Sequence, residues 1–461
     1  MFWLLLLALM ALFVGSLYIG AKRSRQVAGA STSILHSRPS YHGGYLAIMS
    51  TVPALGVLIL WSIAQGPILD SLVVGQFSDQ FAALSLPERE AFLRDARAIA
   101  FGGIVGFTDE LKEAAAEVYA NLHTISLIGM VVVMAALAFL GFRAGYRNIE
   151  PQRRTRHFVE RAVMILLIAC SVVAIFTTIG IVLSLIFESI RFFTMIPIHN
   201  FLFGLHWSPQ SAFAGAGEVV DANPEVFGAI PLIVGTLFIT FIAMIVAGPI
   251  GLFAAIYLSD YASKSVRAIA KPVLEILAGV PTVVYGFFAA LTVAPFIRDS
   301  GQGIGLDVSS ESALAAGLVM GIMIIPFVSS LSDDVITAVP QSLRDGSLAL
   351  GSTKSETIRR VVLPAALPGI VSAMILAISR AIGETMIVVM AAGLAANLTI
   401  NPLEAVTTVT VQIVTLLVGD QEFDSAKTLA AFALGLMLFC VTLTLNFIAL
   451  RVVQKYREQY D

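Results

Sequence analysis

Long apolar runs alternate with short polar stretches along this chain. About nine of the runs are long enough to cross a hydrocarbon core, which takes about 20 helical residues. They are residues 2–20, 44–64, 124–142, 162–188, 229–258, 272–297, 312–332, 367–394 and 428–450. Because lipid cannot satisfy backbone hydrogen bonds, each run is expected to be a helix. The pattern predicts an all-α polytopic membrane protein with about nine transmembrane helices.

The composition supports this class. Hydrophobic residues make up 57% of the 461 residues, charged residues only 13%, and mean hydropathy is +0.88. A soluble protein of this length carries far more charged surface. Cys170 and Cys440 both fall in apolar runs and are interpreted as packing residues, and the six histidines show no metal-ligand spacing. We therefore expect no metal site, and no nucleic-acid partner.

Lysine and arginine fall unevenly on the two sides of the predicted membrane. Alternate connecting stretches carry 20 of these residues on one side and 6 on the other. The positive-inside rule then places the C-terminus in the cytoplasm and the N-terminus on the outside of the membrane. The first run agrees, because Lys22, Arg23 and Arg25 follow it and no charge precedes it. This order predicts a reversed anchor and not a cleaved signal peptide.

The chain is predicted to divide near residue 160. Residues 1–145 form an N-terminal extension with three transmembrane helices and a periplasmic loop, 65–122, in which nine acidic residues outnumber four basic ones. Within this loop, residues 109–123 have an amphipathic helical pattern, which suits either a docking surface or a solvated cap. A basic cytoplasmic linker, 146–160, leads to a six-helix core, 161–461.

The longest cytoplasmic stretch of the core, residues 333–366, predicts two short helices. Pro340 suits the start of the first, where its missing N–H is not needed. Gly351 would end that helix, and Thr353 with Glu356 forms the capping box of the next. Leu363–Pro364 is expected to end the second helix. The same segment resembles a phosphate-binding loop, GxxxxGK[S/T], but serine replaces the lysine and no strand precedes it. This chain is therefore not expected to bind a nucleotide itself.

The spacing in this segment resembles the cytoplasmic motif E-A-A-x₃-G-x₉-I-x-L-P of ABC importer permeases. The matching positions are Asp345, Gly346, Ser347, Gly351, Val361, Leu363 and Pro364. Asp345 and Val361 are conservative departures, while Gly346 and Ser347 replace two alanines. In that family the motif forms a coupling helix that docks into the ATPase subunit. The resemblance assigns this role to residues 341–364.

Six further stretches narrow the resemblance to permeases of the Pst phosphate importer, and most closely to its PstC-type subunit. They are residues 201–209, 227–237, 249–262, 277–288, 323–340 and 379–386, which together span about residues 160–461. The resemblance implies a type I ABC importer core that works with a second, homologous permease of the PstA type. It also implies a homodimeric PstB-type ATPase that binds ATP and Mg, and a periplasmic phosphate-binding protein of the PstS type. It leaves the first three predicted spans unexplained.

One predicted span, 367–394, contains two charged residues, Arg380 and Glu384. Four residues apart, they would share one helical face. An i,i+4 pair that merely orients the helix is possible, but ionisable groups inside a membrane usually mark a functional path. A guanidinium matches two phosphate oxygens, Glu384 could accept a hydrogen bond from a phosphate hydroxyl and hold Arg380 in place, and Thr385 could add a neutral contact.

Glycine and proline interrupt several predicted spans. Candidate hinges or helix breaks are Gly279, Pro281 and Gly286 in the sixth run and Gly383 beside the charged pair, and Gly248, Pro249 and Gly251 interrupt the fifth run. Broken helices near the membrane centre are where transporters expose backbone groups. Ordinary close packing is the alternative for each glycine.

These features predict a permease subunit of an ATP-driven phosphate importer, which is not itself an enzyme. Two other classes stay open: an ion-coupled secondary transporter with Glu384 as proton carrier, and a membrane enzyme or assembly factor. The second would need a catalytic constellation that the sequence does not present. Phosphonate or sulfate would also suit Arg380 as the transported oxyanion.

Overall fold

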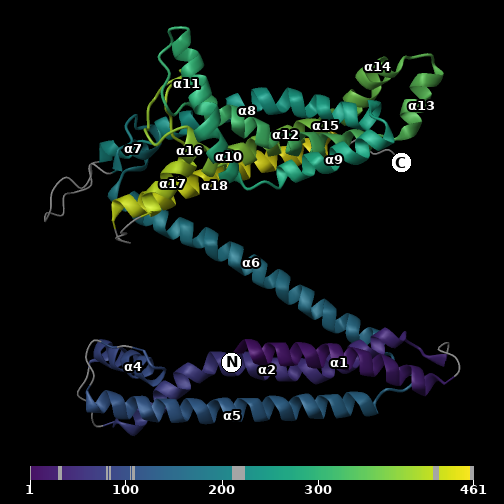
Figure 1. Ribbon diagram of the computed structural model, residues 1–461, viewed down its shortest axis with the longest axis vertical. Helices are drawn as coiled ribbons and strands as arrows, with labels where there is room; N and C mark the ends of the chain where they lie inside the picture. The colour runs from purple at the N-terminus through teal and green to yellow at the C-terminus, as the bar shows by residue number, and fades with distance from the viewer. Residues whose placement is uncertain are drawn as a thin grey trace. The chain divides into compact units, whose positions relative to one another are not determined.

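The computed structural model describes residues 2–29, 34–78, 81, 85–103, 105, 109–209, 224–418 and 425–456. The chain forms two compact units, Met1–Phe176 and Thr177–Asp461. The boundary falls inside a single long helix, α6 (Thr155–Met195), so each unit holds one part of that helix (Figure 1). In the described residues the only β pairing is an isolated bridge between Trp207 and Phe227.

The described residues contain nine helices long and apolar enough to cross a membrane. They are Phe2–Ala28, Pro39–Gln76, Glu110–Arg147, Thr155–Met195, Ile230–Tyr261, Thr282–Gly303, Ala313–Thr337, Lys354–Ile382 and Ala426–Val452. Each overlaps one predicted run, so the prediction of an all-α polytopic membrane protein with about nine spans is confirmed. Many apolar side chains of these helices are exposed on the isolated chain, which suits contact with lipid.

Unit 1 is built on three long helices that lie side by side, α1 (Phe2–Ala28), α2 (Pro39–Gln76) and α5 (Glu110–Arg147) (Figure 1). Glycines bring their backbones together. A Cβ on Gly43 would lie 2.3 Å from the carbonyl oxygen of Leu17, and one on Gly141 would lie 2.0 Å from that of Met49. Such close approach through small residues is a common way for helices to associate in membranes.

The predicted loop 65–122 is mostly helical, which corrects the sequence interpretation. α2 continues to Gln76, a separate helix α4 (Leu86–Ala100) follows, and α5 already begins at Glu110. Ion pairs fix this cap: Arg97 binds Asp70, and Lys112 binds Asp95 at 2.8 Å. The amphipathic stretch 109–123 is thus largely the first part of the third spanning helix, because its apolar face packs under α4.

The centre of unit 2 is the pair α8 (Ile230–Ile256) and α12 (Ala313–Thr337). Their contact buries Ile239, Met320 and Ile324 completely. α8 is continuous, so the break predicted at Gly248, Pro249 and Gly251 is wrong. A Cβ on Gly251 would lie 2.8 Å from Val328 on α12, so the glycine serves close helix packing.

The other elements of unit 2 surround this pair. They are α7 (Ile198–Phe203), η3 (Pro224–Val226), η4 (Tyr257–Tyr261), α9 (Lys264–Ala278), α10 (Thr282–Phe288), η5 (Ala289–Val293), α11 (Ala294–Gly303), α13 (Gln341–Ala349), α14 (Lys354–Thr357), η6 (Ile358–Val362), α15 (Leu363–Ile382), α16 (Met386–Ala391), α17 (Val409–Leu417) and α18 (Ala426–Tyr456). Within this unit α13 and α14 lie at one end, and α7, α11 and α17 lie at the other (Figure 1).

The sixth span begins later than predicted. The run 272–297 is divided, because α9 ends at Ala278 and α10 starts at Thr282. Gly279 follows α9 as its C-cap and Pro281 precedes α10 as its N-cap. Proline restricts the residue before it to extended backbone, which keeps a helix from continuing through this point.

Candidate functional site

The chain breaks its helix beside the predicted charged pair. α15 ends at Ile382, Gly383 is its C-cap, and α16 begins at Met386 after Thr385. A Cβ on Gly383 would meet the carbonyl oxygens of Ser379 and Arg380 at ordinary distances of 3.7 and 3.6 Å. Of the two roles considered for Gly383, the local break is therefore the one observed, and close packing of two helices is not.

Arg380 lies in the last turn of α15 with its side chain exposed on the isolated chain. Its Nη2 is 3.9 Å from the sulfur of Met323, and its guanidinium carbon lies 5.6 Å from the centre of the Phe327 ring. Among the described residues no carboxylate lies within ion-pair distance of it. An aromatic and thioether wall on α12 supports a guanidinium without neutralising it. Arg380 can therefore bind an anion from outside this chain.

The expected pairing of Arg380 with Glu384 is wrong. Glu384 lies beyond the end of α15, so the two residues do not share a helical face. Its Oε1 accepts hydrogen bonds from the amides of Met386 and Ile387, at 3.1 and 3.4 Å, and so caps α16. The carbonyl oxygen of Glu384 accepts a bond from Thr410 at 2.8 Å. The free backbone amides at the start of α16 bind the Glu384 carboxylate in place of Arg380. The four-residue spacing in the sequence does not show this, because it assumes an unbroken helix.

The predicted substrate contact Thr385 lies in the same break. Its hydroxyl donates a hydrogen bond of 3.4 Å to the carbonyl oxygen of Gly383. The break therefore brings Arg380, Glu384 and Thr385 into one short segment, with each side chain in a different setting. A contact of Thr385 or Glu384 with a substrate stays a prediction.

The break between α9 and α10 lies against the same part of the core. The Tyr285 hydroxyl donates a 2.8 Å hydrogen bond to the carbonyl oxygen of Leu277, which satisfies one of the free carbonyls at the end of α9. A Cβ on Gly286 would lie 2.6 Å from the sulfur of Met390. Gly286 thus allows α10 to pack against α16 and does not itself interrupt a helix. A hinge at Gly279 and Pro281 stays a prediction.

In the predicted coupling segment, α13 and the turn after it lie outside the spanning helices, whereas the part from Lys354 onward belongs to one of them. α13 has Pro340 as its N-cap, and Gly351 follows it with φ of +86°, a conformation that favours glycine. The capping box of Thr353 and Glu356 is confirmed, with the Thr353 amide donating to Glu356 at 2.9 Å. Asp345 and Gly346 are exposed on α13. The exposed face of this short helix is available to a partner.

The second helix of this segment does not end at Leu363–Pro364, as the sequence analysis expected. α14, the π-helical turn η6 and α15 form one spanning element, Lys354–Ile382. Pro364 lacks an amide donor, and the π-helical turn η6 lies directly before it, where the wider turn accommodates the missing helical hydrogen bond. The segment after Gly351 is therefore continuous with the helix that carries Arg380.

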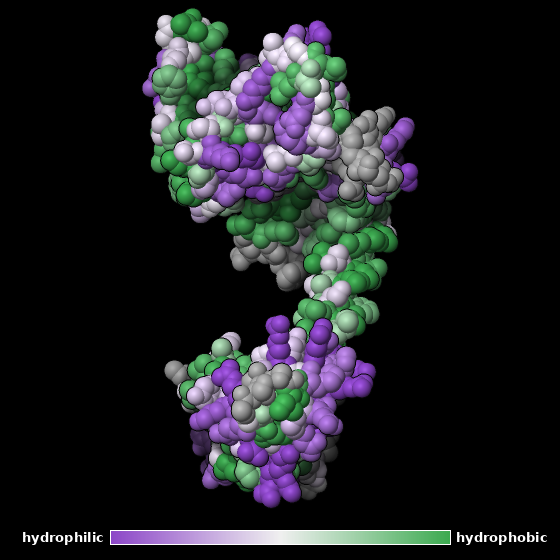
Figure 2. All heavy atoms as spheres, turned by 90° about the vertical axis from the view of Figure 1, so that its right-hand side faces the viewer, coloured by the Kyte–Doolittle hydropathy of each residue, from purple (hydrophilic) through white to green (hydrophobic). Residues whose placement is uncertain are grey.

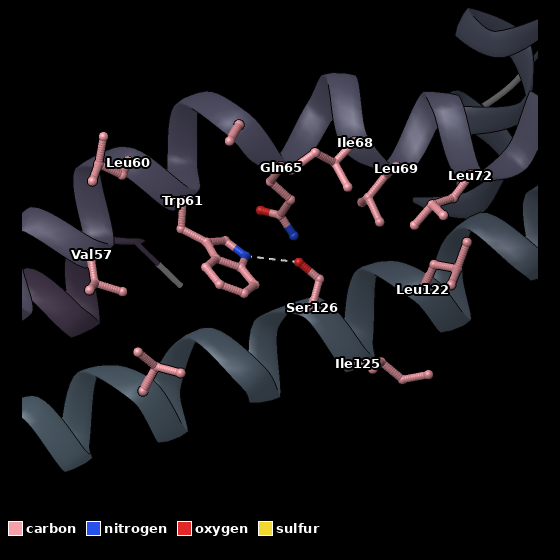
Figure 3. A pocket seen from close by; sticks show the side chains of 12 residues that line it. Val57, Leu60, Trp61, Gln65, Ile68, Leu69, Leu72, Leu122, Ile125 and Ser126 are labelled. Carbon is pink, nitrogen blue, oxygen red and sulfur yellow. Dashed lines mark hydrogen bonds between the residues drawn. The ribbon is translucent and has the colours of Figure 1, made fainter.

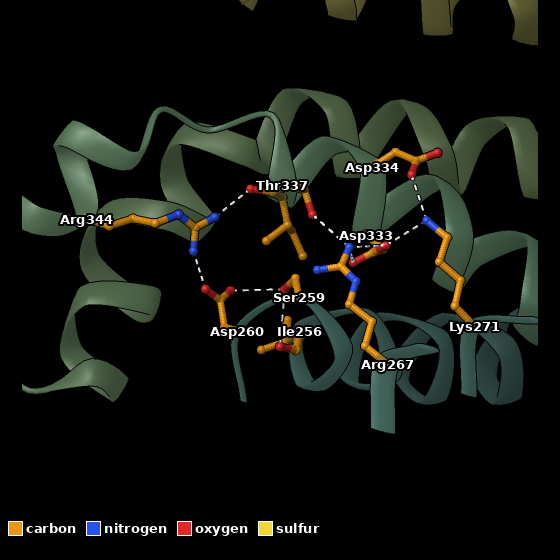
Figure 4. A network of polar contacts seen from close by, with 10 residues as sticks. Ile256, Ser259, Asp260, Arg267, Lys271, Asp333, Asp334, Thr337 and Arg344 are labelled. Carbon is orange, nitrogen blue, oxygen red and sulfur yellow. Dashed lines mark hydrogen bonds and ion pairs between the residues drawn. The ribbon is translucent and has the colours of Figure 1, made fainter. Parts of the chain in front are cut away.

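Two polar networks attach other elements of unit 2 to α12 (Figure 4). The first holds α13 and the second holds α9. In the first, Arg344 on α13 forms a buried ion pair with Asp260 and donates a 2.7 Å hydrogen bond to the carbonyl oxygen of Ile336. Ser347 and Thr357 add a 3.0 Å hydrogen bond between the two helices of the segment. A polar cavity of about 310 Å³ lies beside Asp260 and Arg344. α13 is thus held rigidly to η4 and α12.

In the second network, the Asp333 side chain is only 2% exposed and is bound by two cations of α9. Arg267 donates to both of its oxygens, at 3.0 and 2.9 Å, and Lys271 donates at 3.0 Å. Lys271 also reaches Asp334 at 3.2 Å. The hydrogen bond to Asp333 raises the pKa of Lys271. Together these bonds fix α9, just before its break, to α12.

These two networks were not predicted from the sequence. Asp333 and Asp334 follow directly on an apolar run, and Arg267 and Lys271 are four residues apart on a short basic stretch. Acidic residues at the end of one span and basic residues on a short helix earlier in the chain are a usable signal. Only the packing of α9 on α12 shows that they pair.

The largest cavity among those described lies in unit 1 and has different chemistry. It is about 500 Å³ in volume and lies between α2 and α5 (Figure 3). Apolar side chains line most of it, and Trp61 donates a 2.9 Å hydrogen bond to Ser126. The amide nitrogen of Gln65 is buried there without a partner. No charged side chain lines this cavity, so it does not suit a small anion.

Two family models match this chain, one in each unit. A family model described as "Phosphate ATP-binding cassette transporter" matches residues 5–177. A second model, "Binding-protein-dependent transport system inner membrane component", matches residues 247–458. The first match covers the three spans that the sequence resemblance left unexplained.

Curated relatives match a large part of this chain. The "Probable ABC transporter permease protein YqgH" of Bacillus subtilis is 32% identical over 295 residues, which cover 63% of this chain and 89% of the relative. The "Phosphate transport system permease protein PstC 1" of Mycobacterium bovis is 34% identical over 279 residues, which cover 56% of this chain and 82% of the relative. The chain belongs to the PstC-type permease family. It is a multi-pass component of a transport system that includes an ATPase and a substrate-binding partner.

Among solved structures, the crystal structure of a bacterial alginate ABC transporter in complex with an alginate pentasaccharide-bound periplasmic protein has a chain similar to this PstC-type permease. The TM-score is 0.44 at 16% identity, and the match covers 66% of this chain and 99% of that one.

Proposed function

We propose that this PstC-type permease is a translocation subunit of an ATP-driven phosphate importer, and that Arg380 contacts the phosphate on its path. One observation supports this most directly. Arg380 lies at a helix break in unit 2, exposed, with an aromatic and thioether wall and without a carboxylate partner among the described residues. A guanidinium in such a setting offers two parallel hydrogen bonds to an oxyanion.

The remaining parts of the system are assigned to partner chains. A homologous PstA-type permease would complete the path, and a homodimeric PstB-type ATPase would bind ATP and Mg. A periplasmic PstS-type protein would deliver phosphate. Lysine and arginine counts support a periplasmic N-terminus and a cytoplasmic C-terminus.

Coupling to ATP hydrolysis is assigned to α13 and the turn that follows it. Asp345, Gly346 and Ser347 would contact the ATPase, and Gly351 would shape the turn. The helix from Lys354 to Ile382 has 29 residues, so at 1.5 Å per residue it extends about 40 Å. Because it runs without a break from the turn to Arg380, a displacement of α13 would reach the phosphate path through one helix.

The decisive experiment is ATP-dependent uptake of labelled phosphate by the reconstituted four-component complex. We expect Arg380→Ala to lower uptake about tenfold or more, because a hydrogen bond to a charged group contributes about 1.5–3 kcal/mol. Arg380→Lys should keep part of the activity, since an ammonium keeps the charge but lacks the planar fork.

Arg451→Ala is the matched control, because Arg451 also lies over a phenylalanine ring, Phe447, at 5.1 Å. It should leave uptake unchanged. Wild-type uptake by Arg380→Ala in an assembled complex would refute the assignment of this site. Competition by sulfate or phosphonate at equal concentration would indicate another oxyanion, and uptake that persists without the ATPase but stops with the proton gradient would indicate an ion-coupled carrier.

A further inference from the structure

The apolar cavity between α2 and α5 lies at one end of the spanning part of unit 1 (Figure 3). Gln65 directly follows the apolar run 44–64 of α2, and Ser126 lies near the start of the run 124–142 of α5. Most basic residues of unit 1 lie toward its other end, where hydrophilic side chains gather on the surface (Figure 2). Gln65 and Ser126 therefore lie at the level where these two helices leave the hydrocarbon core, on the side opposite to the basic residues.

The cavity is continuous with apolar surface on the side of the helices. Leu60 and Ile125, which line it, are 69% and 66% exposed on the isolated chain. Ile63 and Ile128, each three residues further along the same helices and outside the lining, are exposed as well. In a bilayer such side chains contact acyl chains. A molecule dissolved in the membrane can therefore enter this cavity sideways, without passing through water.

The cavity is long and narrow. Its lining on α2 extends from Val57 to Leu72, which is about 22 Å at 1.5 Å per residue. Over that length, its volume of about 500 Å³ corresponds to a mean cross-section of roughly 20 Å². A helix with its side chains is about 10–12 Å across and is too wide to enter. An extended hydrocarbon chain fits, because apolar carbon atoms pack at about 3.5–4 Å from one another.

One polar group of the cavity lacks a partner. Gln65 lines the cavity and is only half-buried, but its amide nitrogen is buried and has no hydrogen-bond partner in the described part of the chain. Its amide is directed into the space between α2 and α5 (Figure 3). The Ser126 hydroxyl already accepts a 2.9 Å bond from Trp61. Because buried donors are normally satisfied, an occupant with a hydrogen-bond acceptor suits this cavity.

We propose that this cavity binds one acyl chain of a membrane glycerophospholipid, whose ester carbonyl oxygen accepts a hydrogen bond from Gln65. The ester carbonyls of a phospholipid are neutral acceptors, which suits a cavity without a charged side chain in its lining. They lie between the hydrocarbon core and the headgroups, which is the level of Gln65. The chain extends from there past Leu60 and Val57 into the core, and the glycerol backbone lies beside Ile68.

Trp61 supports this depth, because tryptophan is enriched at the boundary between hydrocarbon and headgroups. The site is built only from unit 1. It therefore does not depend on Arg380 or on the proposed transport activity.

The first test measures how many phospholipid molecules the full chain retains. The protein is purified in detergent, freed of excess lipid and analysed by native mass spectrometry. We expect the wild type to keep at least one phospholipid per chain, identified by its mass. A wild-type chain that carries no phospholipid, or carries detergent alone, would overturn the proposal.

Matched variants decide whether this cavity holds the lipid. Ala64→Phe places a ring in the cavity and should retain one phospholipid fewer than the wild type. Ala135→Phe is the control, because Ala135 is also exposed but lies on α5 outside the lining, and it should retain the wild-type number. Equal retention by the two variants would overturn the proposal.

Gln65→Leu removes the donor and adds no bulk, so it keeps the test valid even if Ala64→Phe does not fold. It should raise the dissociation constant for added phosphatidylcholine about two- to tenfold, because a single neutral hydrogen bond is lost. An unchanged dissociation constant would contradict the bond to the ester carbonyl.

The assembled transporter decides between a lipid and a partner subunit as the occupant. In nanodiscs that contain phosphatidylcholine with a photoactivatable diazirine on its acyl chain, the cavity-lining residues of the wild type should be labelled. Labelling there should fall in Ala64→Phe and persist in Ala135→Phe. The absence of label at these residues in the wild type would mean that a partner segment covers the cavity, and would overturn the proposal.

Discussion

The Glu384 carboxylate accepts two backbone hydrogen bonds at the start of α16. Among the described residues it forms no ion pair, so it does not neutralise the neighbouring Arg380. A carboxylate that caps a helix contributes about 1 kcal/mol. Arg380 is then free to bind an external anion, because its nearest contacts are Met323 and Phe327. At this scale, one helix break separates the helix-capping carboxylate of Glu384 from the guanidinium of Arg380, for which an anion contact is proposed.

This difference predicts distinct outcomes for two changes at Glu384. Glu384→Gln should retain phosphate uptake within about threefold, because an amide oxygen can still accept the bonds from Met386 and Ile387. Glu384→Ala should lower the stability of the segment by about 1 kcal/mol and reduce uptake further. Uptake and thermal unfolding of the reconstituted complex measure both effects. If Gln abolishes uptake as fully as Ala does, a titrating carboxylate is required and the ion-coupled mechanism gains support.

At the scale of elements, the turn between α13 and α14 joins a surface helix to a spanning one. Gly351 has a φ of +86°, and a Cβ there would meet no atom within 4 Å, so backbone strain is the only obstacle to a side chain. Gly346 lies inside α13 and also has open space around it. The two glycines are five residues apart and both have open space around them, but their backbone conformations differ. The effects of an alanine at each position can therefore be compared.

We expect Gly351→Ala to weaken the coupling of ATP hydrolysis to transport, because an L residue in this conformation destabilises the turn by about 1 kcal/mol or more. Gly346→Ala should stabilise α13 by about 1 kcal/mol. It should also preserve coupling, because the motif E-A-A that this segment resembles has alanine at this position of the ATPase contact. The ratio of phosphate transported to ATP hydrolysed, together with copurification of the ATPase, measures the outcome. Equal behaviour of the two variants would show that the shape of this turn has no part in coupling.

At the scale of the whole molecule, the two units match different family models, at residues 5–177 and 247–458. Curated permeases match through 56–63% of this chain and 82–89% of their own length. More than a third of this chain therefore lies outside each of these matches. Most of the length of these relatives is thus matched by only part of this chain.

Removal of residues 1–154, up to the start of α6, should accordingly leave measurable phosphate uptake in the assembled complex. The reason is that the Arg380 break, α13 and both polar networks lie within unit 2. The same truncation with Arg380→Ala serves as the control and should lower this uptake about tenfold or more. Complete loss of uptake by a truncated complex that still binds the ATPase would make unit 1 part of the transport mechanism.

The sequence alone determined the nine spans and the capping box of Thr353, because apolar length and short-range capping depend on residues close along the chain. It also indicated the family through the spacing around Gly351. The tertiary structure decided the roles of Glu384, Gly251 and Gly286, which depend on amides or helices brought near by packing. It also decided that Pro364 continues a helix, and that Asp333 pairs with Arg267 and Lys271, more than 60 residues away. The length of an apolar run determines which residues span the membrane. Contacts between residues far apart in the sequence form only when the helices pack.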